Sequence, residues 1–400
     1  MEIRDPENTI ASTEVSEPVS AEVQDSLEKA QVTDQDSTAK AKKYNRIKLT
    51  LSLIEMALSF TILVALLLAG WSKDFDQIAH RFSASPYIAL FIFGALVGLV
   101  ETVLLFPLGF YSSYILEHKF GLSNQTIWRW LWEEFKGFAV GLVLLTPMVL
   151  IFYFFLRNFG DLWWLPVAAT VFFFSVLLAR IAPILIFPLF YRFEPLPDSD
   201  LKTKILELCQ KVGMRVEGVF KFNMSKNTKK ANAGFTGLGK TKRIILGDTL
   251  LDKFNDDEIE TVFAHELGHY AKGHIWKGIL IGLVSNFAGL YITSVLYKIS
   301  LPVFGFESIE QLGALPLLAL FLTLFGLVTM PIQNAISRRY ERQADTYAVQ
   351  LTGKREAFVL ALKKLSEQNL ADPDPNPVVE SLFYSHPAIK KRVALVKSIA

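Results

Sequence analysis

Six long apolar segments are the feature that most constrains how this chain can fold. A helix needs about 20 apolar residues to cross about 30 Å of hydrocarbon, and each segment meets that requirement. The fourth segment contains Pro183 and Pro188, so we expect a kink near its end, and a seventh span would result if it folded as two pieces. The sequence therefore predicts a mostly α-helical, polytopic membrane protein. The segments lie at approximately 49–71, 87–110, 136–156, 163–190, 276–299 and 313–335.

The distribution of Lys and Arg predicts the orientation of these spans. Basic residues gather before residue 49, between 111 and 135, between 191 and 275, and after 336. Short basic connections are retained on the cytoplasmic side of a membrane. Six crossings then place both termini in the cytoplasm. The same rule places the two polar stretches that flank the last two spans together on that side.

A short motif in the first of these polar stretches indicates a metal site. Residues 256–275 read DDEIETVFAHELGHYAKGHI, with an acidic first turn and apolar residues at helical spacing. His265 and His269 are four residues apart, so a helix presents both on one face. Two imidazoles so placed can bind one zinc ion, and Glu266 is positioned to accept a proton from the water that the metal activates. The alternative, a chance match on a solvated helix face, is disfavoured by the flanking Ala264 and Gly268.

A third ligand is expected from the end of the last span. Residues 334–348 read NAISRRYERQADTYA, which places Glu341 and Asp345 on one helical face. An antiparallel pair of spans would bring this stretch beside the motif. Glu341 would then complete the metal site, and Asp345 would orient a ligand imidazole. His274 is rejected as a ligand, because on a continuing helix it would point away from His265, and it is expected instead to lie at the membrane interface or to contact a ligand from outside the metal site. The alternative for this stretch is an interfacial charge cluster.

With these motifs in order, the chain resembles the integral-membrane CAAX prenyl endopeptidases, which are zinc proteases. The resemblance covers about residues 47–400. It rests on the span pattern and on HELGH at 265–269, SRRYERQAD at 337–345, EHKFGLSNQT at 117–126, PLFYRFEPL at 188–196, ANAGFTGLGKTKRIILGDTLL at 231–251 and SHPAIKKRV at 385–393.

The resemblance implies more than spacing alone can. It implies spans that enclose a water-filled chamber and one zinc ion per chain, held by His265, His269 and Glu341, with Glu266 as the base. It implies that Asn232 and Ala233 hold the peptide backbone, that His386 stabilises the tetrahedral intermediate and that Arg392 lies nearby. From the residues alone, Asn232 could equally belong to a turn, and His386 could cap the helix that follows it.

The resulting expectation for the domains combines a helical membrane part with a cytoplasmic, zincin-like α+β catalytic part. Residues 217–246 are expected to form a small antiparallel ribbon whose exposed edge holds an extended substrate. The predicted divisions are a disordered polar tail at 1–44, spans at 45–192, a catalytic domain at 193–275, spans at 276–336 and a C-terminal helical segment at 337–400.

These observations predict a zinc endopeptidase that is embedded in the lipid bilayer and acts on peptide or protein substrates, which could be prenylated or membrane-embedded. The alternatives are a broad-specificity quality-control protease of the heat-shock type and, more remotely, a scaffold with a structural metal. The near-neutral net charge of +2 gives no sign of a nucleic-acid partner, and a monomer is expected. A single cysteine, Cys209, excludes an intramolecular disulfide and a thiolate-rich zinc site. The expected location is the inner membrane of a bacterium or the endoplasmic reticulum membrane of a eukaryote.

Overall fold

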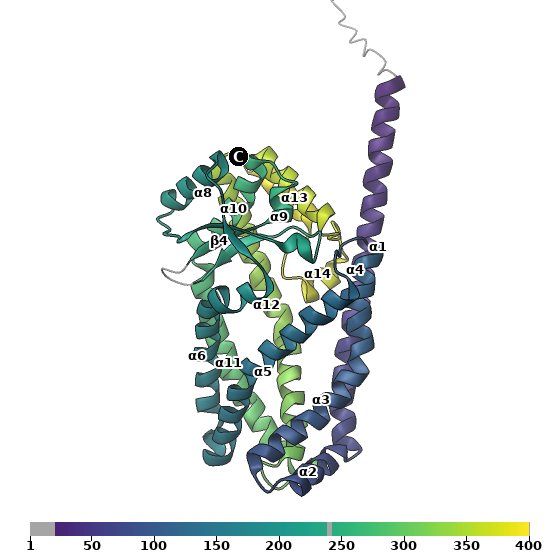
Figure 1. The fold of residues 1–400 in the computed structure, drawn as a ribbon, viewed down its shortest axis with the longest axis vertical. Coiled ribbons are helices and arrows are strands. Elements are labelled where there is room, and N and C mark those ends of the chain that lie inside the picture. Colours follow the sequence, from purple (N-terminus) through teal and green to yellow (C-terminus); the bar gives the residue numbers. More distant parts are fainter. Residues whose placement is uncertain (1–20, 238–241, 400) are drawn as a thin grey trace, which may run out of the picture.

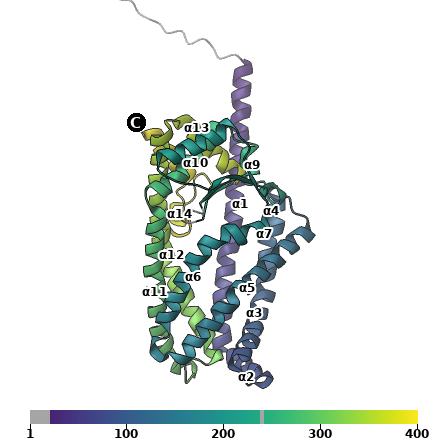
Figure 2. The same cartoon turned by 60° about the vertical axis from the view of Figure 1, so that its left-hand side comes forward.

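Six helices long and apolar enough to cross a membrane dominate the computed structural model, which describes residues 21–237 and 242–399. The prediction of six spans is confirmed within these residues. The spans stand side by side and carry a polar domain at one end (Figure 1, Figure 2). They are built on α1 (Ala21–Leu68), α3 (Pro86–Phe110), α5 (Ile127–Asn158), α6 (Trp164–Leu185), α11 (His274–Ser300) and α12 (Leu315–Thr352).

The first span begins earlier than expected. Helix α1 starts at Ala21, whereas the sequence predicted a disordered tail up to residue 44. Ala41 and Tyr44 are buried in one apolar cluster with Phe120 and Leu370, and this long-range packing stabilises a helix that composition alone did not predict. The rest of the predicted tail, residues 1–20, lies outside the described residues.

The fourth span ends at the prolines, as expected. Helix α6 ends at Leu185, and the following α7 (Phe187–Phe190) has four residues. A segment of that length cannot cross a membrane, so the fourth apolar segment supplies one span rather than two.

A π-helical turn lies in the second span, directly after α3. It covers Tyr111–Ile115 and joins α3 to the short α4 (Leu116–Lys119). At the opposite end of the bundle, α2 (Trp71–Phe82) connects α1 to α3.

The polar domain contains a four-stranded sheet with the order β1-β2-β4-β3. The strands are β1 (Phe193–Pro195), β2 (Gly218–Phe222), β3 (Ala233–Thr236) and β4 (Arg243–Gly247). β3 and β4 pair antiparallel, as predicted, but β2 pairs with β4 in parallel, so the prediction of an entirely antiparallel ribbon is wrong and the sheet is mixed. The reason lies in the long connection after β2, which carries the chain past the position of β4 before it returns.

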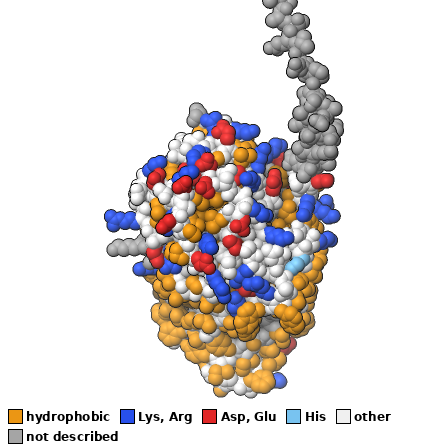
Figure 3. Space-filling view, turned by 45° about the horizontal axis from the view of Figure 1, so that its top comes forward, with side chains coloured by type: hydrophobic (Ala, Val, Ile, Leu, Met, Phe, Trp, Pro, Cys, Tyr) orange, Lys and Arg blue, Asp and Glu red, His pale blue; other side chains and the backbone are white. Residues whose placement is uncertain are grey.

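Helices pack around this sheet to form the core of the polar domain. Ile205, Ile244, Ile259, Phe358 and Val396 are each at most 1% exposed within one cluster, which also contains the buried Cys209. Charged side chains gather on this domain, and hydrophobic ones form a band around the spans below it (Figure 3). The helices are α8 (Asp200–Lys211), α9 (Asp248–Leu251), α10 (Asp256–Ala271), α13 (Arg355–Gln368), α14 (Pro377–Phe383) and α15 (Ile389–Ser398).

Cavities lie between the spans, where the resemblance implied a chamber. One of about 440 Å³ lies beside α1 and contacts Glu55, and one of about 510 Å³ lies between α11 and α12. A third, of about 490 Å³, is lined almost entirely by apolar side chains of α5, α6, α11 and α12. A charged group such as Glu55 is expensive in lipid, and a cavity gives it access to water.

Candidate metal centre

Helix α10 carries the HELGH motif and begins with a capping box. The side chain of Asn255 accepts a hydrogen bond from the N–H of Glu258, whose carboxylate accepts one from the N–H of Asn255. The helix is buried along most of its length, unlike a solvated face, and His265 is 7% exposed. The motif is therefore built into the core of the polar domain.

Three potential metal ligands converge between α10 and α12. The Nε2 atoms of His265 and His269 are 3.3 Å apart, and they lie 3.4 Å and 3.3 Å from the two carboxylate oxygens of Glu341. Donors of a tetrahedral zinc ion at about 2.0–2.1 Å are themselves about 3.3–3.4 Å apart. Glu341 is buried, and its Oε2 has no hydrogen-bond partner among the described residues. The donor set and its spacing therefore fit a metal ion.

A glycine allows the two helices to approach so closely. A Cβ atom built on Gly268 would lie 2.9 Å from Cα of Ala344 and 3.1 Å from its carbonyl oxygen. Both positions are in the interior of a helix, where backbone atoms cannot shift without moving the helix. Gly268 thus sets the separation between His269 and Glu341.

A buried ion pair lies behind His265. Its Nδ1 is 2.9 Å from Oδ1 of Asp345, which is fully buried and also accepts hydrogen bonds of 2.6 and 2.9 Å from the guanidinium of Arg392. Burial alone would lower the pKa of His265, but Asp345 and Glu341 raise it to about 9. Asp345 accepts a hydrogen bond from Nδ1–H of the neutral ring, which leaves the lone pair of Nε2 for a metal, and the negative charge of the two carboxylates favours a cation there.

His274 lies behind the second ligand, which is one of the two roles expected for it, although a turn and not a continuing helix brings it there. Helix α10 ends at Ala271, Gly273 adopts a φ of 68°, and α11 begins at His274. The turn directs Nδ1 of His274 to 3.1 Å from Nδ1 of His269. The glycine two residues after the helix could have revealed this in the sequence.

The other nitrogen of His274 fixes which way that contact runs. Its Nε2 is 2.8 Å from the amide oxygen of Gln343, so Nε2 carries the proton and Nδ1 accepts. His269 therefore donates through Nδ1, and its Nε2 is free for the metal. Stacking on Tyr340, with ring centroids 4.2 Å apart, holds the His274 ring in place. Sequence reasoning assigned no role to Gln343 and Tyr340, although both lie within the SRRYERQAD stretch at 337–345.

A cavity of about 400 Å³ opens beside His265, Glu266 and Glu341. Burial raises the pKa of Glu266, opposed by His265 and His269, as is common for a carboxylate used in acid–base chemistry. The predicted site residues that line this cavity are Asn232, Ala233, His265, Glu266, Glu341, His386 and Arg392.

The loop that carries His386 is held by two charged side chains. Arg338, one helical turn before Glu341, donates hydrogen bonds to the carbonyls of Glu380, Ser381 and Tyr384. The buried carboxylate of Glu380 accepts a hydrogen bond from the N–H of Ala388 and pairs with Lys391.

The loop brings His386 to the metal centre. Its Nε2 lies 3.4 Å from Oε1 of Glu341, and the side chain is exposed. The alternative role as a helix cap is not observed, because α15 follows Ala388 without a side-chain cap.

The edge of β3 lies along the same cavity. Within the described part of the chain β3 pairs with β4 alone, so its other edge is unpaired. Asn232 directly precedes the strand, and its carbonyl accepts a hydrogen bond from the N–H of Gly247. An unpaired edge beside a metal centre can bind an extended peptide by strand addition.

Comparisons with known families cover nearly the whole chain. Residues 195–400 match peptidase family M48, and residues 18–192 match the family described as CAAX prenyl protease N-terminal, five membrane helices.

Individual relatives agree with this assignment. The uncharacterized metalloprotease YhfN of Bacillus subtilis is 33% identical over 89% of this chain and 84% of its own. CAAX prenyl protease 1 of Saccharomyces cerevisiae is 32% identical over 77% of this chain and 72% of its own. The crystal structure of Ste24p from S. mikatae superposes with a TM-score of 0.79 at 27% identity, covering 90% of this chain and 89% of that one.

Proposed function

This chain belongs to peptidase family M48, among the membrane metalloproteases related to CAAX prenyl proteases, and we propose that it is a zinc-dependent endopeptidase with Glu266 as its general base. The observation that carries the choice of zinc is the mutual spacing of 3.3–3.4 Å among the donors of His265, His269 and Glu341. Two histidines and one glutamate with an open fourth position are typical of catalytic zinc.

The chemistry divides between the metal and the protein. A bound zinc ion supplies Lewis acidity and makes a water molecule nucleophilic at neutral pH. Glu266, which lines the cavity, accepts the proton of the attacking water and then delivers it to the leaving amine. His386, 3.4 Å from Glu341, is placed to stabilise the oxyanion.

The substrate enters this scheme as an extended segment. Asn232 and Ala233 would bind its backbone along the unpaired edge of β3, and Arg392, which lines the same cavity, would add to binding. The proposed substrate class is an extended segment of a membrane-attached protein, of which a prenylated C-terminus is one case. The similarity to CAAX prenyl protease 1 supports that case. We place the site and both termini in the cytoplasm, on the basis of the basic connections around the spans.

One comparison tests both the chemistry and the substrate class. The full-length enzyme in detergent is incubated with a farnesylated peptide and with its unfarnesylated twin, with and without a chelator, beside Glu266→Gln. We expect cleavage that the chelator abolishes, that zinc restores and that Glu266→Gln lacks. Cleavage of the farnesylated peptide alone would establish a prenyl requirement, and equal cleavage of both would favour the broad-specificity alternative. Wild-type rates in Glu266→Gln would refute the mechanism.

A further inference from the structure

We propose that Glu117 and Asn369 are positioning residues that tie the peptide-binding edge of β3 to the first membrane helix. The inference rests on the proposed role of β3 in binding substrate. Neither side chain is expected to touch the reacting groups. Both act on residues 227–231, the segment that leads into Asn232 and Ala233.

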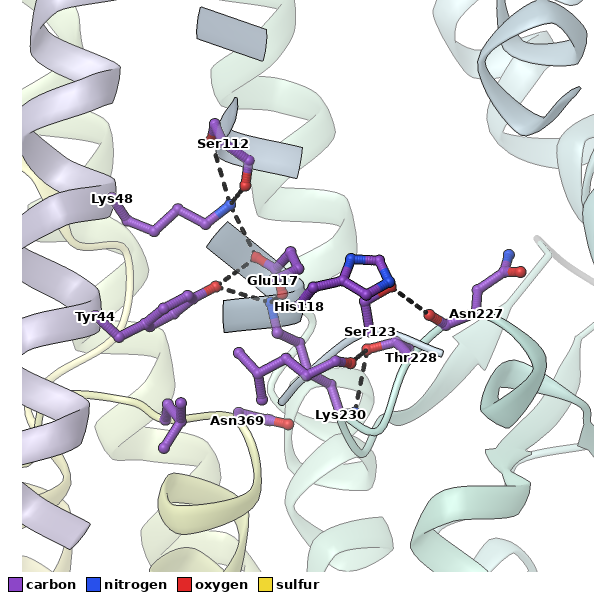
Figure 4. Close-up of polar contacts among 12 residues, drawn as sticks. Tyr44, Lys48, Ser112, Glu117, His118, Ser123, Asn227, Thr228, Lys230 and Asn369 are labelled. Carbon is purple, nitrogen blue, oxygen red and sulfur yellow. Dashed lines mark hydrogen bonds and ion pairs between the residues drawn. The ribbon is translucent and has the colours of Figure 1, made fainter. Parts of the chain in front are cut away.

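Glu117 connects two distant parts of the chain. Its carboxylate accepts a hydrogen bond of 2.6 Å from the hydroxyl of Tyr44 and pairs with Lys48 at 2.9 Å, both on α1. Its second oxygen pairs with Lys230 at 3.0 Å (Figure 4). The Glu117 side chain is 13% exposed, so solvent screens these ion pairs less than it screens surface pairs. Loss of the carboxylate would leave two lysines close together without a counter-charge.

A π-helical turn directs Glu117 to this position. The turn Tyr111–Ile115 adds a residue to the helical repeat between α3 and α4, which rotates α4 relative to α3. Lys48 also donates a hydrogen bond of 2.9 Å to the carbonyl oxygen of Ser112 in this turn. Single π-turns are rare and occur often at functional sites.

A short backbone ladder continues the connection. The loop after α4 runs antiparallel to residues 227–229: the N–H of Asn124 donates to the carbonyl of Asn227, and the N–H of Lys229 donates to that of Leu122. These hydrogen bonds measure 3.0 and 2.8 Å. The loop between two membrane helices is therefore joined directly to the segment that precedes β3.

Asn369 holds the next residue of the segment from the other side. Its amide oxygen accepts the N–H of Ala231 at 2.9 Å, and its amide nitrogen donates to the carbonyl of Ala231 at 3.3 Å. The following Leu370 has a φ of 49°, the one positive value for a non-glycine residue in the described chain. Its carbonyl accepts a hydrogen bond from Asn45 of α1. The surroundings thus maintain an unfavourable backbone conformation at the residue after Asn369.

Together these contacts hold the end of the segment, Lys230 and Ala231, from two sides. Lys230 is tied through Glu117 to α1 and α4, and Ala231 is tied through Asn369 and Leu370 to α1. Asn232 and Ala233 follow immediately, along the cavity of the metal centre. The position of the β3 edge relative to the metal therefore depends on the membrane helices, and loss of the tie should weaken binding of long peptides without changing the metal.

The test uses the full-length enzyme and two probes of different reach. An extended ten-residue peptide that wild type cleaves would occupy the β3 edge, whereas acetohydroxamate binds only at the metal. The variants are Glu117→Gln, Asn369→Ala and Lys230→Met, with Lys230→Arg to restore the charge. Glu217→Gln is the matched control, because it removes a carboxylate paired with Arg243 at 2.6 Å elsewhere on the same sheet.

We expect Glu117→Gln and Asn369→Ala to raise KM for the peptide roughly tenfold with kcat nearly unchanged, the pattern of lost uniform binding. Inhibition by acetohydroxamate and zinc content should match wild type. Lys230→Arg and Glu217→Gln should behave as wild type. The combined Glu117→Gln/Lys230→Met variant should be no worse than the poorer single variant, because both substitutions remove the same ion pair between Glu117 and Lys230.

Amide hydrogen exchange gives a readout that does not need activity. Residues 231–236 should exchange faster in Glu117→Gln than in wild type, with β2 unchanged. An unchanged KM together with unchanged exchange would overturn the proposal. So would a raised KM accompanied by parallel losses of kcat, bound zinc and thermal stability, because that pattern indicates a general structural role. Failure of the proposed protease mechanism would appear separately, as activity retained in Glu266→Gln.

Discussion

The Nδ1 atom of His265 lies 2.9 Å from Oδ1 of Asp345, a carboxylate with no exposed surface. One ring nitrogen is thereby committed to the protein, and the other faces His269 and Glu341. Such partners fix the orientation of a ligand imidazole and increase its basicity.

The first prediction follows from this contact. Asp345→Asn should lower metal affinity about 10- to 100-fold, the usual effect of removing such a partner. Competition with a chromophoric chelator measures it. Asp257→Asn is the control and should bind metal as wild type does. Asp257 lies on the same helix as His265, and its exposed carboxylate pairs with Lys354. Equal affinities in all three proteins would contradict the assignment.

Glu266→Gln should keep its metal and lose activity. The amide preserves shape but cannot accept the proton, and general-base catalysis contributes about 10²- to 10⁴-fold. Metal analysis and cleavage rates of the same preparation provide the measurement. A variant that loses metal and activity together would instead assign Glu266 a structural role.

His274→Phe should weaken metal binding less than Asp345→Asn does. The phenyl ring can keep the stack on Tyr340 but removes the acceptor that faces Nδ1 of His269. The lost partner is neutral, and hydrogen bonds to neutral groups are about half as strong as those to charged ones. The same chelator competition ranks the two variants, and the reverse order would be evidence against the tautomer assigned to His269.

Gly268→Ala should separate α10 from α12. Its Cβ would contact the backbone of Ala344 at 2.9 Å, and overpacking of this kind costs about 1–3 kcal/mol. The thermal unfolding temperature and the metal content should both fall, because His269 and Glu341 move apart. Gly282→Ala in α11, where a Cβ meets nothing within 4 Å, is the matched control. Normal metal content in Gly268→Ala would show that the helices can adjust.

The stability that Glu380 gives to the loop carrying His386 should depend on pH. Burial would raise the pKa of Glu380, but Lys391 and the N–H of Ala388 lower it below the ordinary value. A lowered native pKa means that the ionised carboxylate stabilises the fold above the unfolded pKa of about 4.3, and that this stability is lost as the pH falls through the native pKa. The thermal unfolding temperature of wild type should therefore exceed that of Glu380→Gln at neutral pH, and the two temperatures should converge in acid. A difference that persists at low pH would contradict the ion pair as its cause.

The sequence predicted those parts of the fold and site that depend on local pattern. Six spans follow from apolar length, and the meeting of His265 with Glu341 follows from the antiparallel order of the last two spans. The parallel pairing of β2 with β4 could not be predicted, because strand order depends on long-range packing.

Long-range contacts also explain the other differences. Tyr44 extends the first helix because it packs against residues far along the chain, and composition cannot predict such contacts. The expectation of a continuing helix through His274 is wrong because the chain makes a left-handed turn at Gly273. Gln343 and Asn369 act through side-chain amides, and the sequence does not distinguish these two residues from an ordinary surface Asn or Gln.

Helix α12 runs without interruption from Leu315 to Thr352, through the membrane and into the metal centre. An α-helix turns about 100° and rises about 1.5 Å per residue, so the span fixes the angular phase of Glu341 as well as its height. One alanine inserted in the apolar half would rotate Glu341 by about 100° away from the two histidines, whereas seven would nearly restore the rotation and displace it by about 10 Å. The length of this span is therefore under a constraint that is separate from membrane thickness: it must match the rotation that the chemistry requires.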